Sequence, residues 1–481
     1  MNAFSRILPV TLVGLIGAMA LVFPLGAAEE KPHIILVMAD DQGWGDMAYQ
    51  GDPVVKTPNF DDAAATGLRF DRFYAAAPVC SPTRASVMTG RHPNRMGVFK
   101  WGHPMRPQET TIAEALKTAG YTTGHFGKWH LGSVRKQSPA NPGNNGFDRW
   151  VSAPNYYDND AVMSDEGTAV QKKGESSFIA VDDCLDWMKD ALQEDAPIFA
   201  VIWFGSPHQP HRAVEEDRAH YEDQPKNRKD FLGEITGMDR AFGKLRDSLS
   251  ELGIRENTIL WYCSDNGALP KIGNAGGFRG HKAKVYEGGL LVPAILEWPE
   301  KIETPRATSV RCNTSDLYPT LLEIAGVSLE KQAPLDGISL VPLIENKAPA
   351  ARTSPMGFWD HVVKGVGTPS DTWMGELLTA QQSGQDLPPH PSSAGAADLP
   401  NPPHPTDSFP GHSAWIDGDW KLHRIQDQKT GELTWELYEL GSDPKEETDV
   451  AADHAERVAE MRKGLEDWLE SVARSLNGED Y

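Results

Sequence analysis

The sequence predicts an α/β fold in which a large mixed, mostly parallel sheet carries helices on both faces. A smaller C-terminal α+β subdomain follows, with an antiparallel sheet and a packed helix. Two observations predict this architecture. Buried-strand patterns alternate with helical patterns across residues 32–299, and strand patterns followed by an amphipathic helix occupy residues 412–476. A chain of 481 residues is also long enough for one large domain and a smaller second domain.

The N-terminal segment is typical of a secretory signal peptide. Arg6 is the only full charge before an apolar run at 7–26, and small residues follow up to Ala28. A transmembrane anchor is the alternative. Pro24 and the small-residue exit favour removal, and no later stretch approaches the roughly 20 apolar residues that a span needs. We therefore expect residues 1–28 to be cleaved near Ala28, leaving a soluble periplasmic or secreted protein without a stable membrane anchor.

Short apolar runs that stop at polar residues predict the strands of the large sheet. Such runs are typical of parallel strands buried on both faces. They lie at 32–41, in the second half of 111–132, and at 196–208, 257–267 and 289–299. Helical patterns occupy the first half of 111–132 and residues 238–254. Ligands of such sheets bind beyond the carboxyl ends of the strands, which is where these polar residues lie.

The composition changes after residue 346. We expect a large domain at 29–350 and a C-terminal subdomain at 351–481. Residues 365–412 are rich in Pro, Gly, Ser and Asp, and they predict a long structureless insertion that is either functional or disordered. Its His390 and His404 could suggest a metal site, but the prolines beside them favour an extended linker.

The end of the chain regains regular patterns. Residues 412–425 and 433–440 resemble antiparallel strands, with the turn at 430–432 between them. Residues 454–476 predict a helix whose apolar stripe serves core packing. The stripe consists of Val458, Met461, Leu465, Trp468, Leu469 and Val472.

Charge and cysteine content limit the partners. The formal net charge of −22 argues against nucleic acid and anionic membranes, which require a basic face. It does not exclude a small anion held by local cations. The four cysteines are Cys80, Cys184, Cys263 and Cys312. Export normally converts cysteines to disulfides, yet Cys80 has no neighbouring cysteine.

Two polar pairs follow predicted strands and favour a cation site. Asp40 and Asp41 end one strand, and Asp265 and Asn266 end another. Adjacent carboxylates repel unless a cation or proton intervenes, and an all-oxygen set suits Ca²⁺; Mg²⁺ demands tighter geometry. The alternative is a helix N-cap at Asp41 and a simple turn at 265–267.

Cationic residues gather in loops that the same sheet would bring together. Each alone is better explained by a surface charge or a hydrogen-bonded loop histidine than by a catalytic role. Together with one or two histidines, Arg84, Lys128 and Lys282 could surround an oxyanion in sulfuryl or phosphoryl transfer. The histidines of these loops are His130, His208, His211 and His281.

Short motifs surround several of these charged residues, beginning with "CSPTRASVMTGR" at 80–91. This segment resembles the Cys-x-Pro-x-Arg signature of the type I, formylglycine-dependent sulfatases of the alkaline-phosphatase-like superfamily. "GKWHLG", "SDNG" and "KVYEGGLLVPAI" follow in the expected order, so the match runs from about residue 32 to residue 300. The resemblance implies that a formylglycine-generating or sulfatase-maturing enzyme oxidises Cys80 to Cα-formylglycine during export. The hydrated aldehyde then attacks sulfur with one hydroxyl and expels sulfate with the other.

The resemblance also implies roles for the site residues. Asp40, Asp41, Asp265 and Asn266, with modified Cys80, would bind Ca²⁺. Arg84 would hold the diol, and Lys128 and Lys282 would neutralise the sulfate oxygens. His130 would take the proton when the aldehyde reforms. His208 would protonate the leaving alcohol, with His211 a weaker candidate because "SPHQPH" could align three residues away.

The resemblance leaves alternatives open. A phosphodiester or phosphonate hydrolase of the same superfamily would carry more metal-binding His and Asp residues. A catalytically silent, calcium-dependent glycan-binding protein would lack part of the catalytic set. The substrate class that we expect is a sulfated carbohydrate, and Trp101, His103, Trp359 and His361 could line a sugar subsite. Ordinary packing explains the two tryptophans equally well.

Overall fold

The computed structural model describes Met1 and residues 30–347, 351–393 and 398–481. The predicted signal peptide therefore lies, apart from Met1, outside the described residues, and its cleavage stays a prediction. Residues Pro32–Tyr481 form one compact unit. Among the described residues, no helix combines the length and the apolar character that crossing a membrane requires.

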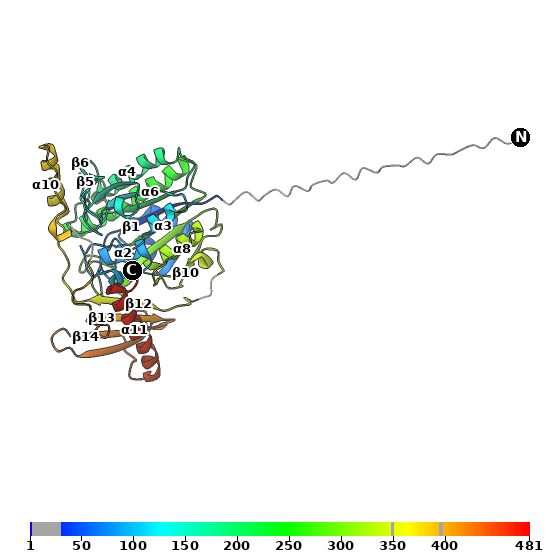
Figure 1. Cartoon of the computed structure of the whole chain (residues 1–481), viewed down its shortest axis with the longest axis vertical. Coiled ribbons are helices and arrows are strands. Elements are labelled where there is room, and N and C mark those ends of the chain that lie inside the picture. The colour runs from blue at the N-terminus through cyan, green and yellow to red at the C-terminus, as the bar shows by residue number, and fades with distance from the viewer. Residues whose placement is uncertain (2–29, 348–350, 394–397) are drawn as a thin grey trace. The chain divides into compact units, whose positions relative to one another are not determined.

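The large sheet is mixed and mostly parallel, as predicted (Figure 1). Its strand order is β10-β2-β9-β8-β1-β7-β3-β4-β5-β6, and β11 pairs with β2. The central strands β8, β1, β7, β3 and β4 run parallel to one another, whereas β9 is antiparallel to β2 and β8, and β5 is antiparallel to β4 and β6. The strands are β1 His33–Ala39, β2 Leu68–Tyr74, β3 Thr122–Lys128, β4 Arg149–Ala153, β5 Val162–Asp165, β6 Thr168–Gln171, β7 Ile198–Trp203, β8 Thr258–Ser264, β9 Leu291–Glu297, β10 Arg306–Thr308 and β11 Cys312–Asn313.

Helices cover both faces of this sheet because its central strands are apolar on both sides. Along β1, Ile34, Leu36 and Met38 enter one hydrophobic core, and Ile35, Val37 and Ala39 enter the other. Helices α2 Cys80–Thr89, α3 Ile112–Lys117 and α8 Leu317–Ala325 contribute to the first core, and α1 Pro58–Thr66, α4 Ser176–Ala191 and α6 Lys226–Glu251 to the second. Shorter helices are α5 Glu215–Arg218, α7 Glu287–Leu290 and α9 Val341–Ile344.

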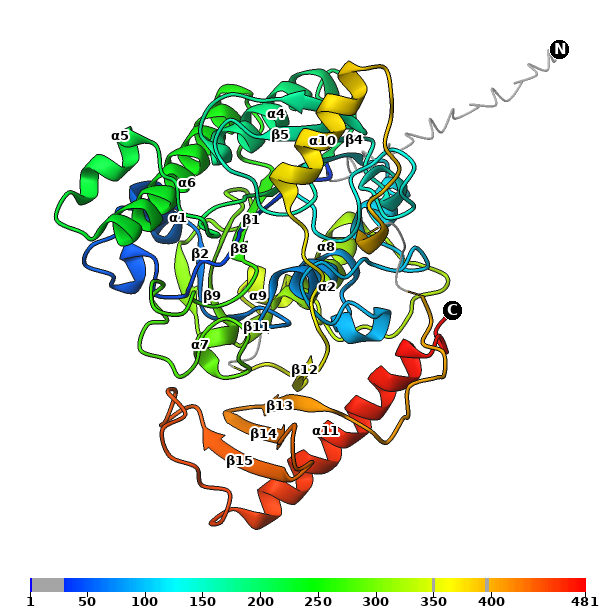
Figure 2. The ribbon, with the colours of Figure 1, turned by 90° about the vertical axis from the view of Figure 1, so that its left-hand side faces the viewer.

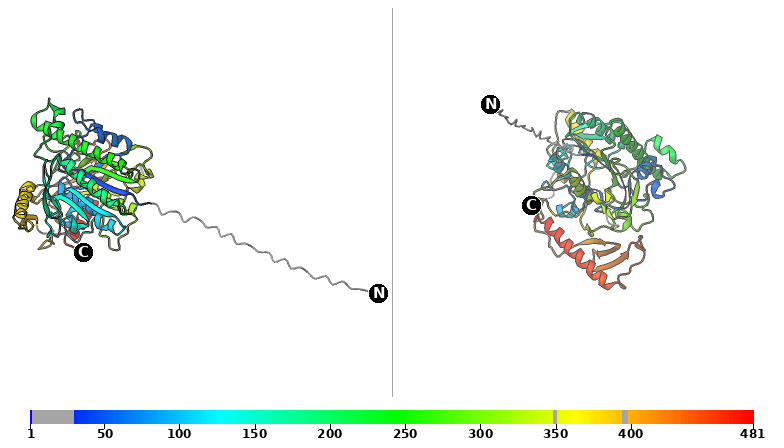
Figure 3. Two further views of the ribbon diagram at one scale, coloured as in Figure 1. Left: turned by 90° about the horizontal axis from the view of Figure 1, so that it is seen from above. Right: turned by 90° about the vertical axis from the view of Figure 1, so that its right-hand side faces the viewer.

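The C-terminal part forms the predicted antiparallel sheet and helix (Figure 2). The sheet has the order β12-β13-β14-β15, with strands β12 Met356–His361, β13 Gly411–Asp417, β14 Trp420–Gln426 and β15 Leu433–Glu439. The single strand expected at 412–425 is instead two strands, because the chain turns at Gly418, whose φ is 58°. Helix α11 Ala455–Leu476 lies along this sheet (Figure 3). Of its predicted stripe, Met461, Leu465, Leu469 and Val472 are buried, and Val458 and Trp468 are partly buried.

The insertion at 365–412 is not structureless, which corrects the sequence prediction. It contains helix α10 Ser370–Gln382. Trp373, Met374 and Leu377 are buried on one side of this helix, and Met374 and Leu377 join the first core of the large sheet. Helix α10 has few apolar positions, and prolines and glycines dominate the composition of the segment around it. The helical periodicity of its apolar residues is therefore weak in the sequence.

Candidate active site

The candidate site lies at the carboxyl ends of four neighbouring strands. Asp40 follows β1, Asp265 follows β8, His208 lies beyond β7, and Lys128 ends β3. Because these strands are adjacent in the order β8-β1-β7-β3, residues far apart in sequence meet at one edge of the sheet. The sequence prediction that the strand ends form one polar site is therefore consistent with the topology.

The backbone at this edge adopts conformations that are rare for residues with a side chain. Asp41 has φ 73° and His130 has φ 57°, both in the left-handed region. The Asp41 amide donates to Asp265 Oδ1 at 3.0 Å, and the Asp40 amide donates to the Ser206 carbonyl at 3.0 Å. These bonds tie the loop after β1 to its neighbours on both sides and hold the strained residue in place.

Three buried carboxylates at this edge are each paired with a cation. Lys128 Nζ donates to Asp40 Oδ2 at 2.7 Å, and Lys282 Nζ donates to Asp41 Oδ2 at 2.6 Å. Arg84, one helical turn after Cys80 on α2, donates to Asp265 Oδ2 at 2.7 Å. Pairing is required because an uncompensated charge in the interior is costly.

The carboxylates nevertheless differ in proton affinity. Burial raises the pKa of Asp40 to about 8, although the Lys128 ammonium opposes the shift. Burial would also raise the pKa of Asp41, but Lys282, His208 and Lys128 hold it below its usual range.

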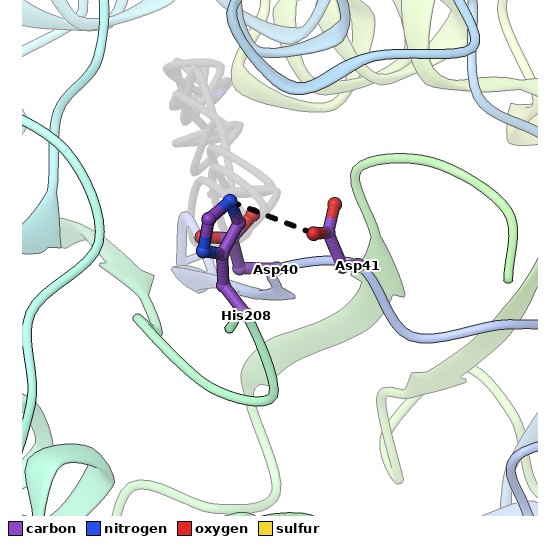
Figure 4. A group of neighbouring side chains, drawn as sticks. All are labelled: Asp40, Asp41 and His208. Carbon is purple, nitrogen blue, oxygen red and sulfur yellow. Dashed lines mark ion pairs between the residues drawn. The ribbon is translucent and has the colours of Figure 1, made fainter. Parts of the chain in front are cut away.

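Two buried oxygen atoms at this edge have no hydrogen-bond partner among the described residues. They are Asp40 Oδ1 and Asn266 Oδ1. Such atoms are costly to bury unless something else binds them. Single atoms of Asp40, Cys80 and Asp265 also lie within 4.8 Å of one another, as do those of Asp40, Asp41 and His208 (Figure 4). The donor set fits a hard divalent cation such as Ca²⁺.

Cys80 is the first residue of α2 and is 2% exposed. Burial raises the pKa of its thiol. A thiol of this kind is a poor nucleophile because the thiolate is the reactive form. Cys184, Cys263 and Cys312 are also buried and free, so these three form no disulfide.

A pocket of about 430 Å³ opens at this edge. Five of its lining residues were predicted from the sequence, namely Cys80, Trp101, His130, His208 and Lys282. The His208 ring stacks on Tyr156 with centroids 4.6 Å apart, and its Nε2 lies 3.6 Å from Asp41 Oδ2. Predicted residues from five separate segments therefore converge on one cavity.

The sequence reasoning missed the other half of the lining. The missed residues are Asn155, Tyr156, Gly367, Thr368 and Pro369. The pair at 155–156 follows β4, so the strand-end rule would have identified it if β4 had been recognised. For 367–369 no local signal exists, because the segment reaches the pocket only through the tertiary fold.

Other predicted residues lie outside the pocket lining. Trp359 is 2% exposed and donates its indole N–H to the Pro410 carbonyl, which agrees with the packing alternative. His361 is buried and packs against Phe99, with ring centroids 4.7 Å apart. His103 Nε2 bonds the Lys364 carbonyl at 2.9 Å.

His211 is likewise outside the lining, and its position distinguishes it from His208. Its Nδ1 lies 3.1 Å from Glu234 Oε2 on α6, and its side chain is 3% exposed. Of the two histidines in "SPHQPH", His208 is therefore the one that reaches the pocket.

Comparison with known proteins gives consistent matches. The family model described as Sulfatase matches residues 32–327. N-acetylgalactosamine-6-sulfatase of Canis lupus familiaris is 33% identical over 358 residues, which cover 66% of this chain and 67% of that protein. Arylsulfatase A of Homo sapiens is 32% identical over 369 residues, covering 68% and 70%. The chain thus spans about two thirds of the length of these relatives.

A solved structure matches almost the whole chain. The crystal structure of Ps i-CgsB in complex with k-i-k-neocarrahexaose has a TM-score of 0.75 and 24% sequence identity. The match covers 93% of this chain and 98% of that one. At this identity the likeness shows the fold alone, including both sheets.

Proposed function

We propose that this chain, which belongs to the sulfatase family, is a sulfuric ester hydrolase that acts on a sulfated carbohydrate. The observation that carries the proposal is the pocket. Cys80, His130, His208 and Lys282 line it, and partnerless buried oxygens lie at the same strand edge. A carbohydrate substrate is supported by a relative whose name specifies a sulfated sugar, N-acetylgalactosamine-6-sulfatase.

The proposal includes a calcium ion. Asp40, Asp41, Asp265 and Asn266 would hold it, together with the modified side chain of Cys80. When bound, the cation would polarise a sulfate oxygen and lower the pKa of the attacking hydroxyl. The lack of hydrogen-bond partners for Asp40 Oδ1 and Asn266 Oδ1 among the described residues supports this assignment. Mg²⁺ is the less suitable ion because it requires near-octahedral geometry.

We propose further that a maturing enzyme converts Cys80 to formylglycine during export. The raised thiol pKa shows only that an unmodified Cys80 would be a poor nucleophile in the folded protein. The hydrated aldehyde supplies a nucleophilic hydroxyl and a second hydroxyl that expels the sulfate.

The cationic side chains would then act on the substrate itself. Lys128 and Lys282 would stabilise the negative charge of the sulfate oxygens in the transition state, and Arg84 would hold the diol. His208 would donate a proton to the leaving alcohol, and His130 would accept the proton released when the aldehyde reforms.

The domain assignment is part of the proposal. Residues 1–28 would be a signal peptide, 29–350 the catalytic domain and 351–481 a C-terminal subdomain that includes the insertion at 365–412. Export to the periplasm or the medium would bring the chain to polysaccharide substrates.

Mass spectrometry of the tryptic peptide 73–84 from protein secreted by its native host tests the proposal. We expect Cys80 to have lost its sulfur and become an aldehyde, and the same preparation to release sulfate from sulfated sugars. An unmodified thiol would favour the catalytically silent glycan-binding alternative. Preferential hydrolysis of phosphonate monoesters over sulfate esters would favour the phosphonate hydrolase alternative.

A further inference from the structure

We propose that Thr368 is a positioning residue for His130, and that the segment Gly365–Pro369 is held in place for this purpose. The inference rests on the proposed function of His130 as the proton acceptor. It also gives a role to part of the 365–412 insertion, which the family motifs leave without one.

The His130 side chain is held by a single hydrogen bond among the described residues. Its Nε2 lies 3.2 Å from Thr368 Oγ1, and its Nδ1 is buried without a partner. The residue is 2% exposed and its backbone is left-handed, with φ 57°. Because one ring nitrogen is occupied by the hydroxyl, the other is left for the reacting group, and the ring cannot rotate without losing the bond.

The segment that carries Thr368 is anchored on two sides. The Val366 amide donates to the Trp101 carbonyl at 2.8 Å, and Asn155 Nδ2 donates to the Thr368 carbonyl at 3.2 Å. Gly102, next to Trp101, donates its amide to Ser81 Oγ at 2.8 Å, beside Cys80. The segment is thereby connected to the start of α2 and to the strand end after β4.

Close packing at Gly365 fixes the segment more tightly than hydrogen bonds alone. A Cβ added at Gly365 would lie 2.2 Å from the Trp101 indole, so a larger residue there would displace either the indole or the segment. A Cβ added at Gly102 would lie 2.1 Å from the Val366 carbonyl oxygen. Two glycines thus allow the two backbones to meet, and Thr368 follows within three residues.

Comparison of Thr368→Val with Thr368→Ser tests the hydroxyl. Valine keeps the shape and removes the hydrogen bond, whereas serine keeps the hydroxyl. We expect Thr368→Val to lower kcat about 10-fold on a sulfated monosaccharide with KM nearly unchanged, and Thr368→Ser to recover most of the loss. Thr372→Val, an exposed threonine on the first turn of α10, is the matched control and should leave kcat unchanged.

Three results would overturn the role of Thr368. These are an unchanged kcat in Thr368→Val, an equal loss in the serine variant, or a rise in KM alone, which would make Thr368 a substrate contact. A loss in Thr372→Val as large as that in Thr368→Val would also contradict it.

A second pair of variants displaces the whole segment without changing Thr368. Gly365→Ala places a methyl group against Trp101, whereas Gly375→Ala, within α10, meets nothing within 4 Å. We expect Gly365→Ala to lower kcat at least as much as Thr368→Val and Gly375→Ala to have no effect. Equal activity of the two alanine variants would contradict the proposal.

Crystal structures separate the failure of this inference from the failure of the proposed function. We expect the His130 ring to be rotated, or present in two orientations, in Thr368→Val but not in Thr368→Ser. This readout does not require activity. An unchanged ring in the valine variant would overturn the inference even if the enzyme is a sulfatase. A formylglycine-containing wild type without sulfatase activity would overturn the proposed function. The orientation of the His130 ring in the two Thr368 variants would still decide whether Thr368 positions His130.

Discussion

Two of the buried clusters of charged groups in the described residues differ in how completely they are paired. The first is the candidate site at the edge of the large sheet. The second, which we call the Lys421 cluster, consists of Lys421, Glu287, Glu446, His423 and Tyr74 and lies between the large sheet and the C-terminal sheet. Both clusters are shielded from water, so the charged groups of each have lost their hydration on folding.

The Lys421 cluster is complete without any ligand. Lys421 Nζ lies 2.8 Å from Glu287 Oε1 and 3.0 Å from Glu446 Oε1. The Tyr74 hydroxyl donates to Glu287 Oε2, the Glu287 amide donates to Glu446 Oε2, and His423 Nε2 lies 2.7 Å from Glu446 Oε1. All four carboxylate oxygens are thus satisfied within the protein.

The candidate site has the same types of ion pair but leaves Asp40 Oδ1, Asn266 Oδ1 and His130 Nδ1 without hydrogen-bond partners among the described residues. The comparison teaches that buried charge alone does not identify a site. Partnerless atoms next to a pocket distinguish a cluster that binds something from one that joins two parts of the fold.

The largest expected difference concerns turnover. Replacing Cys80 by alanine should lower kcat/KM for a sulfate ester by about 10⁴-fold or more, because no other group could replace the formylglycine hydroxyl. The same variant should unfold at nearly the same urea concentration as the wild type. Steady-state kinetics and urea denaturation measure both quantities. Retention of turnover by Cys80→Ala would remove Cys80 from the mechanism.

The Lys421 cluster should show the opposite behaviour. Lys421→Met leaves Glu287 and Glu446 buried without their cation, so we expect the free energy of unfolding to fall by about 3–5 kcal/mol. Lys445→Met, next to Glu446 but exposed, is the control and should change stability little. Urea denaturation followed by circular dichroism would decide, and equal stability of the two variants would contradict the structural role of the cluster.

Calcium should stabilise one cluster and not the other. With unmodified protein, Ca²⁺ at 100 times its dissociation constant should raise the free energy of unfolding by about 2.7 kcal/mol. The gain should disappear in Asp40→Asn and persist in Lys421→Met, and Mg²⁺ should give a smaller gain. Thermal unfolding with and without each ion, at constant ionic strength, measures the effect. A calcium response that survives in Asp40→Asn would locate the ion elsewhere.

The parts of the site that could be predicted from sequence are those whose position follows from strand ends. Asp40 and Asp265 end continuous apolar runs, and a parallel sheet necessarily brings such ends to one edge. Cys80 and Lys128 were identified through short motifs whose residues keep fixed spacing. The main strands were predictable for the same reason, since burial on both faces leaves an unbroken apolar pattern.

The rest depends on contacts that no local pattern records. Thr368 meets His130 across 238 positions of sequence, and nothing in a segment rich in glycine and proline predicts that contact. Helix α10 was missed because its apolar positions are few and its flanks resemble a linker. The division of residues 412–425 into β13 and β14 is different, because Gly418 and Asp419 form a two-residue hairpin loop, a local signal that the sequence reasoning overlooked.

The smallest expected effect is the contribution of His423, in the Lys421 cluster, to the pH dependence of stability. Burial, with Lys421 and Arg279 nearby, lowers the pKa of His423 in the folded protein below the value of about 6.5 that an unfolded histidine has. The unfolded state therefore binds more protons as the pH falls below about 6.5, so this contribution to stability is complete above that pH and is lost as the pH decreases. Between pH 7 and pH 5 the loss of stability from His423 cannot exceed about 2 kcal/mol.

The free energy of unfolding of His423→Gln should depend less on pH than that of the wild type, by up to this amount. His220→Gln, at an exposed position, should match the wild type. Urea denaturation at pH 5, 6 and 7 measures the slopes. Identical slopes for His423→Gln and the wild type would show that His423 titrates alike in both states, and the cluster would then owe its stability to the Lys421 ion pairs alone.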